Sequence, residues 1–438
     1  MQKVGSRLFR WQTLTLTLMG FGYSGYYLCR SNFSIVLPQM IQDLAAQGMS
    51  INDAKIQLGS VVSLSVLGYA LAKFFSGPIS EWVGGRRGFL IGMFGSIIFT
   101  VLFSLGGSIP FFTLAAIGNR LFQSMGWINV VKISSRWFSY SSYGSIMGIL
   151  SLSYMFGDAA ARKILSYFLD FNMDWRTIYL LSAGILCVLF LANLFFLKES
   201  PNDIGEPEPP ENKSSLIKFD EHENSNTSVL SIFKILLSNR TFVLICVLSL
   251  GCTLVREAFS TWVALYYTEI GYDTVRAASS SAWFPLFGGI SVFIAGFISD
   301  RLGYNGRALI LSYGLLCTTL LLFILGFVKF GYGSRWEEFL ISLIAFALIG
   351  PYSYLGGAMA LDIGGKRGSA IASGMIDGVG YIGGFLSGGT LARVTVSFGW
   401  SGTFYTLAGV AFLSFLAAVY YLVEQKKLLI SEEVLDPA

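Results

Sequence analysis

The amino-acid sequence predicts an all-α integral membrane protein, in which twelve transmembrane helices form two pseudo-symmetric six-helix bundles. Composition is the first observation: 54% of the 438 residues are hydrophobic, only 13% are charged, and the mean hydropathy is +0.62. A soluble globular protein of this size does not have such a composition. The other two observations are a series of twelve long apolar segments and an internal repeat that relates the two halves of the chain.

Each apolar segment is long enough to cross a bilayer, because a transmembrane helix needs about 20 mostly apolar residues. The first segment is too long for a cleaved signal peptide and ends without a small-residue cleavage site, so we expect it to be retained. The twelve segments cover roughly residues 11–39, 56–80, 88–106, 109–131, 144–170, 177–197, 241–268, 279–299, 308–328, 338–361, 368–392 and 400–423.

A loop motif after the second segment recurs after the eighth, at an offset of 219 residues. We expect this motif to act in conformational change. Because each half contains six segments, both halves start in the same orientation, and an axis along the membrane normal relates them. In both copies a small residue is followed by an acid, a turn with glycine and an arginine, namely Gly77, Glu81 and Arg87, then Gly296, Asp300 and Arg307.

The repeat and the charges predict the domain organisation. We expect an N-terminal bundle at 1–197, a linker at 198–237, a C-terminal bundle at 238–425 and a tail at 426–438. The linker holds four of the ten prolines and many charges, so it cannot form a core. Eighteen of the 30 Lys and Arg residues fall on the side of the termini and linker, and six on the other. By the positive-inside rule that side is cytoplasmic, and the net charge of +4 reflects topology rather than nucleic-acid binding. A bacterial inner membrane is the expected location.

Arg30 lies between two charge-free apolar runs, in the middle of the first segment. An arginine at that depth costs at least about 2.5 to 3.5 kcal/mol, so it should face a cavity or a partner. At 3.6 residues per turn, Tyr23, Tyr27 and Arg30 share one helix face. Arg256 occupies the equivalent place in the seventh segment, 226 residues later.

If the halves pack about a central axis, the guanidinium groups of Arg30 and Arg256 converge on one site near the midplane. Two such groups suit a doubly charged oxyanion, which arginine holds through two parallel hydrogen bonds. The alternative is that a buried acid neutralises each arginine, and Glu257 is the nearest candidate.

Several short motifs are spread over the apolar segments. They are Gly22-Tyr23 with Tyr26-Tyr27-Leu-Cys-Arg30-Ser-Asn-Phe33, Lys73, Gly126-Trp127 with Lys132, Arg256 with Trp262, Gly350-Pro351, and Gly380-Tyr-Ile-Gly-Gly384. With these motifs the chain resembles the major facilitator superfamily, and within it the organophosphate:phosphate antiporters, a family of glycerol-3-phosphate, hexose-phosphate and phosphoglycerate transporters and related sensors. The resemblance implies the major facilitator fold and exchange of an organic phosphate for inorganic phosphate by alternating access. It implies that Arg30 and Arg256 grip the phosphate, with Tyr23, Tyr27 and Lys73 nearby.

The sequence also departs from that family. Tyr154 stands where characterised glycerol-phosphate carriers have a histidine, and it cannot titrate near neutrality. We include Tyr154 and Trp262 among the predicted substrate-binding residues. The fifth segment further carries Asp158, Arg162 and Lys163. Asp158 and Arg162 are spaced i, i+4 and either neutralise each other or reshape the cavity for a different substrate.

Two other charges within segments have open roles. Asp377 pairs with Arg256 or Lys73, or it acts in gating. Arg120 lies on a superfamily motif in the fourth segment, where packing or conformational coupling fits better than substrate contact.

The leading functional hypothesis is therefore an organophosphate:phosphate antiporter, embedded in the lipid bilayer as a monomer. The alternatives are a membrane sensor that binds a sugar phosphate and signals to a partner kinase, and a proton-coupled exporter that uses Asp377 or Asp158. We expect neither an enzyme nor a cofactor, because the chain has no G-x-x-x-x-G-K-[ST] phosphate loop and no clustered nucleophile and base. Its one histidine, His222, and five scattered cysteines indicate no metal site.

Overall fold

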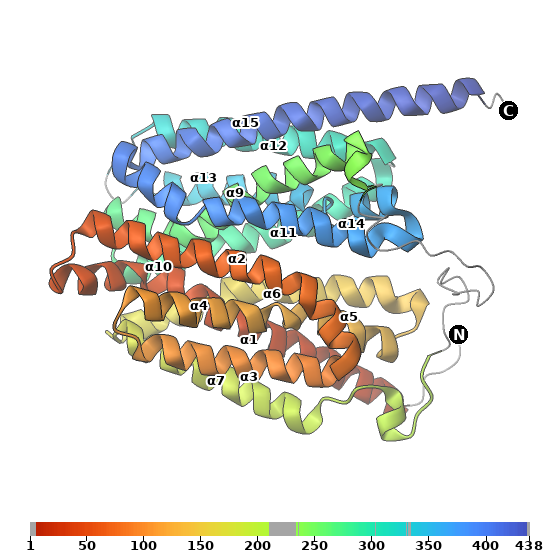
Figure 1. The fold of residues 1–438 in the computed structure, drawn as a ribbon, viewed down its shortest axis with the longest axis horizontal. Coiled ribbons are helices and arrows are strands. Elements are labelled where there is room, and N and C mark those ends of the chain that lie inside the picture. Colours follow the sequence, from red (N-terminus) through yellow and green to blue (C-terminus); the bar gives the residue numbers. More distant parts are fainter. Residues whose placement is uncertain are drawn as a thin grey trace. The chain divides into compact units, whose positions relative to one another are not determined.

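The computed structural model describes residues 6–209, 234, 236–302, 304–329, 331 and 334–435, and the regular elements in these ranges are all helices (Figure 1). Their bounds are α1 Ser6–Ala46, α2 Ile51–Val83, α3 Gly85–Leu105, α4 Ile109–Gln123, α5 Met125–Trp137, α6 Tyr140–Asp170, α7 Trp175–Phe196, the short 3₁₀ helix η1 Pro201–Ile204, α9 Arg240–Glu269, α10 Thr274–Ser281, α11 Trp283–Leu302, α12 Tyr304–Phe327, α13 Trp336–Tyr352, α14 Ala358–Leu386 and α15 Gly389–Leu435.

Each predicted segment coincides with one of these helices or with two consecutive ones. The fourth segment is divided into α4 and α5 at Ser124, and the eighth into α10 and α11 at Ala282. Pro285 explains the second break, because its nitrogen has no hydrogen to donate to the carbonyl of Ser281. Conversely, α15 joins the end of the eleventh segment to the twelfth across a kink at Gly399, whose φ is 67°.

Seven helical stretches in the described residues are long and apolar enough to cross a membrane, so this is a multi-pass membrane protein. The other predicted segments are short helices, such as α4, α5 and α13, or carry polar groups, as α1 and α6 do. The seven stretches are Ile51–Ser76, Gly85–Leu105, Trp175–Phe196, Arg240–Glu269, Thr274–Ile298, Gly306–Phe327 and Ala372–Gln425.

The chain divides into two compact units. Unit 1 contains Met1–Ser215 and Thr261–Leu286, and unit 2 contains Leu216–Ser260 and Phe287–Ala438. In unit 1, α1 packs on α6 and α7, α3 packs on α4 and α7, and α10 packs on α6. In unit 2, α12 lies along α15 and α13 (Figure 1). The last part of α9, from Thr261, and the whole of α10 therefore belong to the same unit as helices from the first half of the sequence. The predicted bundle boundaries stay a prediction.

The core of unit 1 brings α1 against α3. Met19 and Tyr26 are buried there with Phe89 and Met93. The Tyr26 hydroxyl donates a hydrogen bond to the Phe89 carbonyl at 2.8 Å. A side chain at Gly92 would lie 2.4 Å from that hydroxyl, so glycine is required for this close approach. This packing fixes the orientation of α1, the helix that carries Arg30.

The ends of α3 and α7 cap each other. The Glu199 carboxylate, just after α7, accepts hydrogen bonds from the backbone N–H groups of Gly85 (2.9 Å) and Arg86 (2.6 Å) at the start of α3. In return, the Arg86 guanidinium donates to the carbonyls of Leu197 and Leu194, both at 2.6 Å, at the end of α7. An anion at a helix N-terminus and a cation at a C-terminus both stabilise the helix dipole.

Replacing Glu199 by glutamine is therefore expected to lower the free energy of unfolding by about 1 kcal/mol, because the neutral amide loses its charge at the α3 N-terminus. The ion pair with Arg136, at 3.3 Å, is also lost. Thermal unfolding in detergent measures the effect, and Glu206→Gln is the control. An unchanged midpoint for Glu199→Gln would show that the carboxylate charge does not stabilise this junction.

Candidate functional site

Arg30 lies on α1 beside two tyrosine rings of unit 1. Its guanidinium carbon is 5.5 Å from the ring centroid of Tyr27 and 5.0 Å from that of Tyr69. The ammonium nitrogen of Lys73, one turn further along α2, is 5.4 Å from the same Tyr69 ring. Cations over aromatic faces are attracted by the ring quadrupole. The structure thus brings Arg30, Tyr27 and Lys73 together, and it adds Tyr69, which the sequence prediction did not include.

Four aromatic rings form a closed circuit next to Arg30, which we call the aromatic box: Tyr23, Tyr27, Trp127 and Tyr154. Successive ring centroids are 5.7 Å apart for Tyr23 and Tyr27, 6.4 Å for Tyr27 and Tyr154, 6.2 Å for Tyr154 and Trp127, and 5.4 Å for Trp127 and Tyr23. Gly126 permits it, because a side chain there would lie 2.9 Å from the Tyr23 ring. Tyr23 is buried in the core of unit 1, and the other three rings are half-buried and pack against that core.

Arg256 lies on α9, in unit 2, and forms an ion pair. Its Nη2 atom is 2.7 Å from Oε1 of Glu257, and the two side chains are 16% and 5% exposed. The sequence left neutralisation by Glu257 open as an alternative, and for Arg256 that alternative is present. The physical reason is that a buried charge is costly unless it is paired.

The rest of the Arg256 environment is aromatic and polar. Its guanidinium carbon is 5.2 Å from the ring centroid of Tyr352 and 5.9 Å from that of Tyr381. Thr253 donates a hydrogen bond to the Tyr352 hydroxyl at 3.2 Å. The Nε–H of Arg256 is buried and has no hydrogen-bond partner within the described ranges. One donor of this guanidinium is therefore available for an acceptor from a ligand.

Three further candidates from the sequence, Trp262, Arg120 and Asp377, lie on three different helices. Trp262 is buried on α9, and Arg120 is half-buried in the last turn of α4. Asp377 lies on α14, where a side chain at Gly356 would come within 3.0 Å of its carboxylate. Neither of the two open roles of Asp377 is assigned by this position.

The three extra charges of the fifth segment lie on α6. Arg162 is fully buried, and its Nε atom is 3.0 Å from Oδ1 of Asp158. Ser31, adjacent to Arg30, donates to the same Asp158 oxygen at 2.5 Å. Lys163 is exposed and donates to the Ser279 hydroxyl. Asp158 and Arg162 therefore form the i, i+4 ion pair that one alternative predicted, while an effect of these charges on the cavity stays a prediction.

The loop motif is described only in part. Arg87 is exposed at the start of α3, and Gly296 and Arg307 are partly buried on α11 and α12. The side chains at Gly77, Glu81 and Asp300 lie outside the described residues. The glycine turn of the first copy is Gly84, whose φ of 92° favours glycine.

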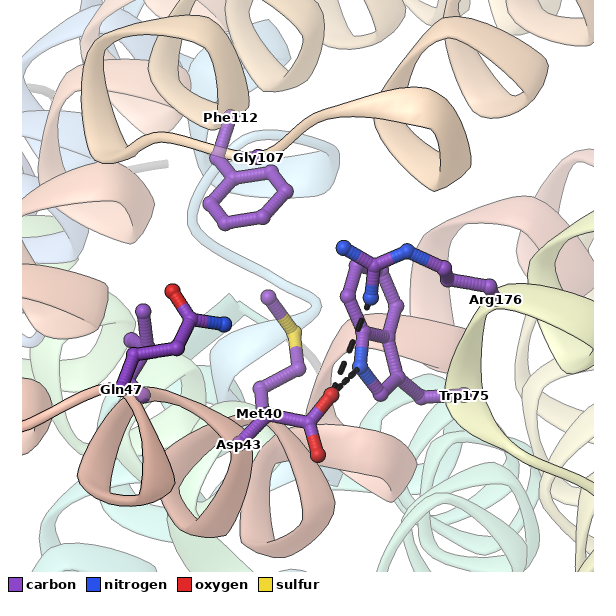
Figure 2. Close-up of a pocket in the computed structure, with 8 residues that line it drawn as sticks. Met40, Asp43, Gln47, Gly107, Phe112, Trp175 and Arg176 are labelled. Carbon is purple, nitrogen blue, oxygen red and sulfur yellow. Dashed lines mark hydrogen bonds and ion pairs between the residues drawn. The ribbon is translucent and has the colours of Figure 1, made fainter.

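A small cavity of unit 1 lies where α1 ends and α7 begins (Figure 2). The Asp43 carboxylate accepts a hydrogen bond from the Trp175 indole at 2.6 Å and lies 3.7 Å from the Arg176 guanidinium, which stacks on the Trp175 ring. The space is about 10 Å³, enough for one water molecule. We therefore interpret this site as a structural link between α1 and α7.

Comparison with known proteins defines the class. Residues 19–388 match the family model of the Major Facilitator Superfamily, and the chain belongs to that superfamily. A solved D-xylose–proton symporter has the same fold, with a TM-score of 0.71 at 15% identity, over 94% of this chain and 96% of that one. The predicted fold class is confirmed.

The more specific resemblance is confirmed by curated relatives. A probable hexose phosphate transport protein of Chlamydia muridarum is 27% identical, over 93% of this chain and 90% of its own length. The glycerol-3-phosphate transporter of Bacillus subtilis is 25% identical, over 91% and 90%. The glucose-6-phosphate exchanger SLC37A2 of Bos taurus is 29% identical, over 80% and 77%.

Proposed function

We propose that this protein is a secondary transporter that exchanges a sugar phosphate for inorganic phosphate by alternating access. The observation that carries the proposal is the cluster of Arg30 and Lys73 around Tyr69, next to the aromatic box, on helices of a membrane protein. Two cations on apolar helices suit a doubly charged oxyanion. Relatives named as phosphate-ester transporters support the same substrate class.

In this proposal Arg30 and Arg256 grip the phosphate group from the two halves of the repeat. Their equivalence rests on the offset of 226 residues. Arg256 contributes its Nε–H, which lacks a protein acceptor among the residues described. For the Nη2 group of Arg256, the phosphate competes with the Glu257 carboxylate. Tyr352 and Tyr381 add hydroxyl groups beside Arg256, as Tyr27 and Tyr69 do beside Arg30.

The aromatic box favours a sugar as the organic part of the substrate. Aromatic rings pack against the apolar C–H faces of a sugar, and the hydroxyl groups of Tyr27 and Tyr154 can hydrogen-bond its rim.

In this proposal, exchange follows from the positive charge of the site. Arg30 and Lys73 are cations on apolar helices, and moving cations between the inward and outward states through an apolar environment is costly. A bound phosphate lowers that cost, so the carrier reorients when loaded. Either phosphate species satisfies the charge, and exchange then needs no ion gradient.

Proteoliposomes test this function directly. Vesicles loaded with inorganic phosphate should take up labelled glucose 6-phosphate, whereas vesicles without internal phosphate should take up little. Binding of glucose 6-phosphate without flux would indicate the sensor instead. Uptake driven by a pH gradient and insensitive to phosphate would indicate a proton-coupled carrier. We also propose a monomer in a bacterial inner membrane with both termini cytoplasmic, and the distribution of Lys and Arg residues supports that orientation of the termini.

Replacing Glu257 by glutamine should tighten phosphate binding about tenfold, because it removes the carboxylate that competes for Arg256 at 2.7 Å. The unliganded variant should unfold at a lower temperature, since Arg256 loses its charged partner. The increase in melting temperature on adding phosphate should therefore be larger than in the wild type. Glu424→Gln on α15 is the control. A smaller increase would mean that Glu257 holds Arg256 in its binding position.

A further inference from the structure

The ion pair of Asp158 and Arg162 is the centre of a polar contact among three helices of unit 1, which we call the α6 junction. Asp158 accepts the Ser31 hydroxyl of α1 at 2.5 Å, and Arg162 donates from Nη1 to the Ser281 hydroxyl at the end of α10, at 3.3 Å. The two contacts are made by the two members of this ion pair, which both lie on α6. The helix that carries Arg30 is therefore connected through this pair to α10.

Segment 261–286 is attached to the rest of unit 1 by polar contacts at other points as well. The Ser34 hydroxyl of α1 donates to the Thr261 carbonyl at 2.8 Å. Lys55 at the start of α2 forms an ion pair of 2.5 Å with Glu269, and the two side chains are 13% and 30% exposed. Lys163 donates to Ser279 beside the α6 junction. Polar contacts of this kind can exchange for water contacts, whereas a fully apolar interface could not.

The arrangement on α6 keeps Arg162 paired whether or not α10 is attached. Asp158 lies one turn away on the same helix, so a movement of α10 does not separate the two charges. The hydrogen bond from Arg162 to Ser281 has a neutral hydroxyl acceptor, so its loss breaks no charge pair when Ser281 moves away. A buried arginine held by an acid on α10 would instead leave two unpaired charges after the same movement.

We propose that Asp158 and Arg162 are positioning residues of the transport cycle, which hold Ser31 and Ser281 against α6 and release α10 when the anion at Arg30 shifts α1. This inference rests on the proposed function, because it assigns a step of alternating access. Gly157 supports it. A side chain there would lie 2.8 Å from Ser24 Oγ and 3.0 Å from its Cα atom, so α1 and α6 are in close contact one residue before Asp158.

Single and double neutral variants test the junction. Asp158→Asn and Arg162→Gln each leave one buried charge without its partner, and each should lower the maximal exchange rate at least tenfold. The phosphate concentration for half-maximal thermal stabilisation should change less than threefold. The double variant, with both substitutions, keeps the shapes of the two side chains but removes both charges. Its maximal exchange rate should be at least threefold higher than that of either single variant. Asp170→Asn, at the exposed end of α6, is the control.

A second readout reports the position of α10 itself. Ser280→Cys places a thiol at a buried position of α10, and a membrane-impermeant maleimide should label it faster in the Ser281→Ala and Arg162→Gln backgrounds than in the Ser280→Cys protein alone. The proposal would be overturned if the labelling rate did not change in these backgrounds. It would also be overturned if Asp158→Asn and Arg162→Gln both exchanged phosphate at the wild-type rate, or if their phosphate affinity fell in proportion to their exchange rate. If the wild type binds phosphate without exchange, the proposed function fails, and the labelling comparison still decides whether the junction holds α10.

Discussion

Replacing Arg30 or Arg256 by lysine is expected to reduce phosphate-driven uptake by more than about 100-fold, although the positive charge is retained. Arginine binds a phosphate through two parallel hydrogen bonds from a rigid fork, whereas lysine offers a single point charge. Hydrogen bonds to charged groups contribute about 1.5 to 3 kcal/mol each, so the loss of one or two accounts for this decrease. Arg30 should also lose its contacts with Tyr27 and Tyr69.

Uptake of labelled phosphate into phosphate-loaded proteoliposomes measures the effect, with the amount of folded protein matched by gel filtration. Arg10→Lys is the matched control, because Arg10 lies on α1 at an exposed position near its start. Exchange at more than about a tenth of the wild-type rate in Arg30→Lys would mean that charge alone, and not the guanidinium geometry, serves at this position.

The second large effect concerns the packing of α9 against α14 in unit 2. A side chain at Gly383 would lie 2.1 Å from the carbonyl oxygen of Leu250 and 3.2 Å from the backbone nitrogen of Leu254. These are backbone atoms, so the helices themselves must separate. Gly383→Ala should therefore lower the free energy of unfolding by about 3 kcal/mol or more, as overpacking at a close helix contact does.

Gly374→Ala is the control on the same helix, because no atom of a neighbouring residue lies within 4 Å of the place that an added Cβ atom would take. Alanine also favours a helix over glycine by about 1 kcal/mol, so this variant should be as stable as the wild type or slightly more so. Thermal unfolding in detergent compares the two. Equal stability of Gly383→Ala and Gly374→Ala would contradict the close approach of α9 and α14, and with it the placement of Tyr381 near Arg256.

The positions of the helices could be predicted from the sequence because a membrane leaves the backbone few alternatives. Every amide must be hydrogen-bonded within its own segment, so a long apolar run is a helix. The break at Ser124 has no such signal, since serine is compatible with a helix interior. The membership of residues 261–286 in unit 1 was also not predictable, because it depends on contacts such as Lys55 with Glu269.

For the site, the sequence predicted the rare features and missed the common ones. Arg30 and Arg256 were found because a charge inside an apolar helix is unusual. Tyr69, Tyr352 and Tyr381 were missed because the chain has 21 tyrosines, and only the tertiary contacts with the two arginines distinguish these three. Glu199 was missed for a similar reason, since its partners lie more than a hundred residues earlier.

A double-mutant cycle on phosphate binding tests most directly whether Arg30 and Arg256 hold the same anion. Isothermal titration calorimetry would give the binding free energy for the wild type, Arg30→Lys, Arg256→Lys and the double variant. One phosphate per chain, and a combined loss that differs from the sum of the single losses by at least about 1 kcal/mol, are expected for two residues on one ligand. Additive losses, or two independent phosphate sites, would contradict the account.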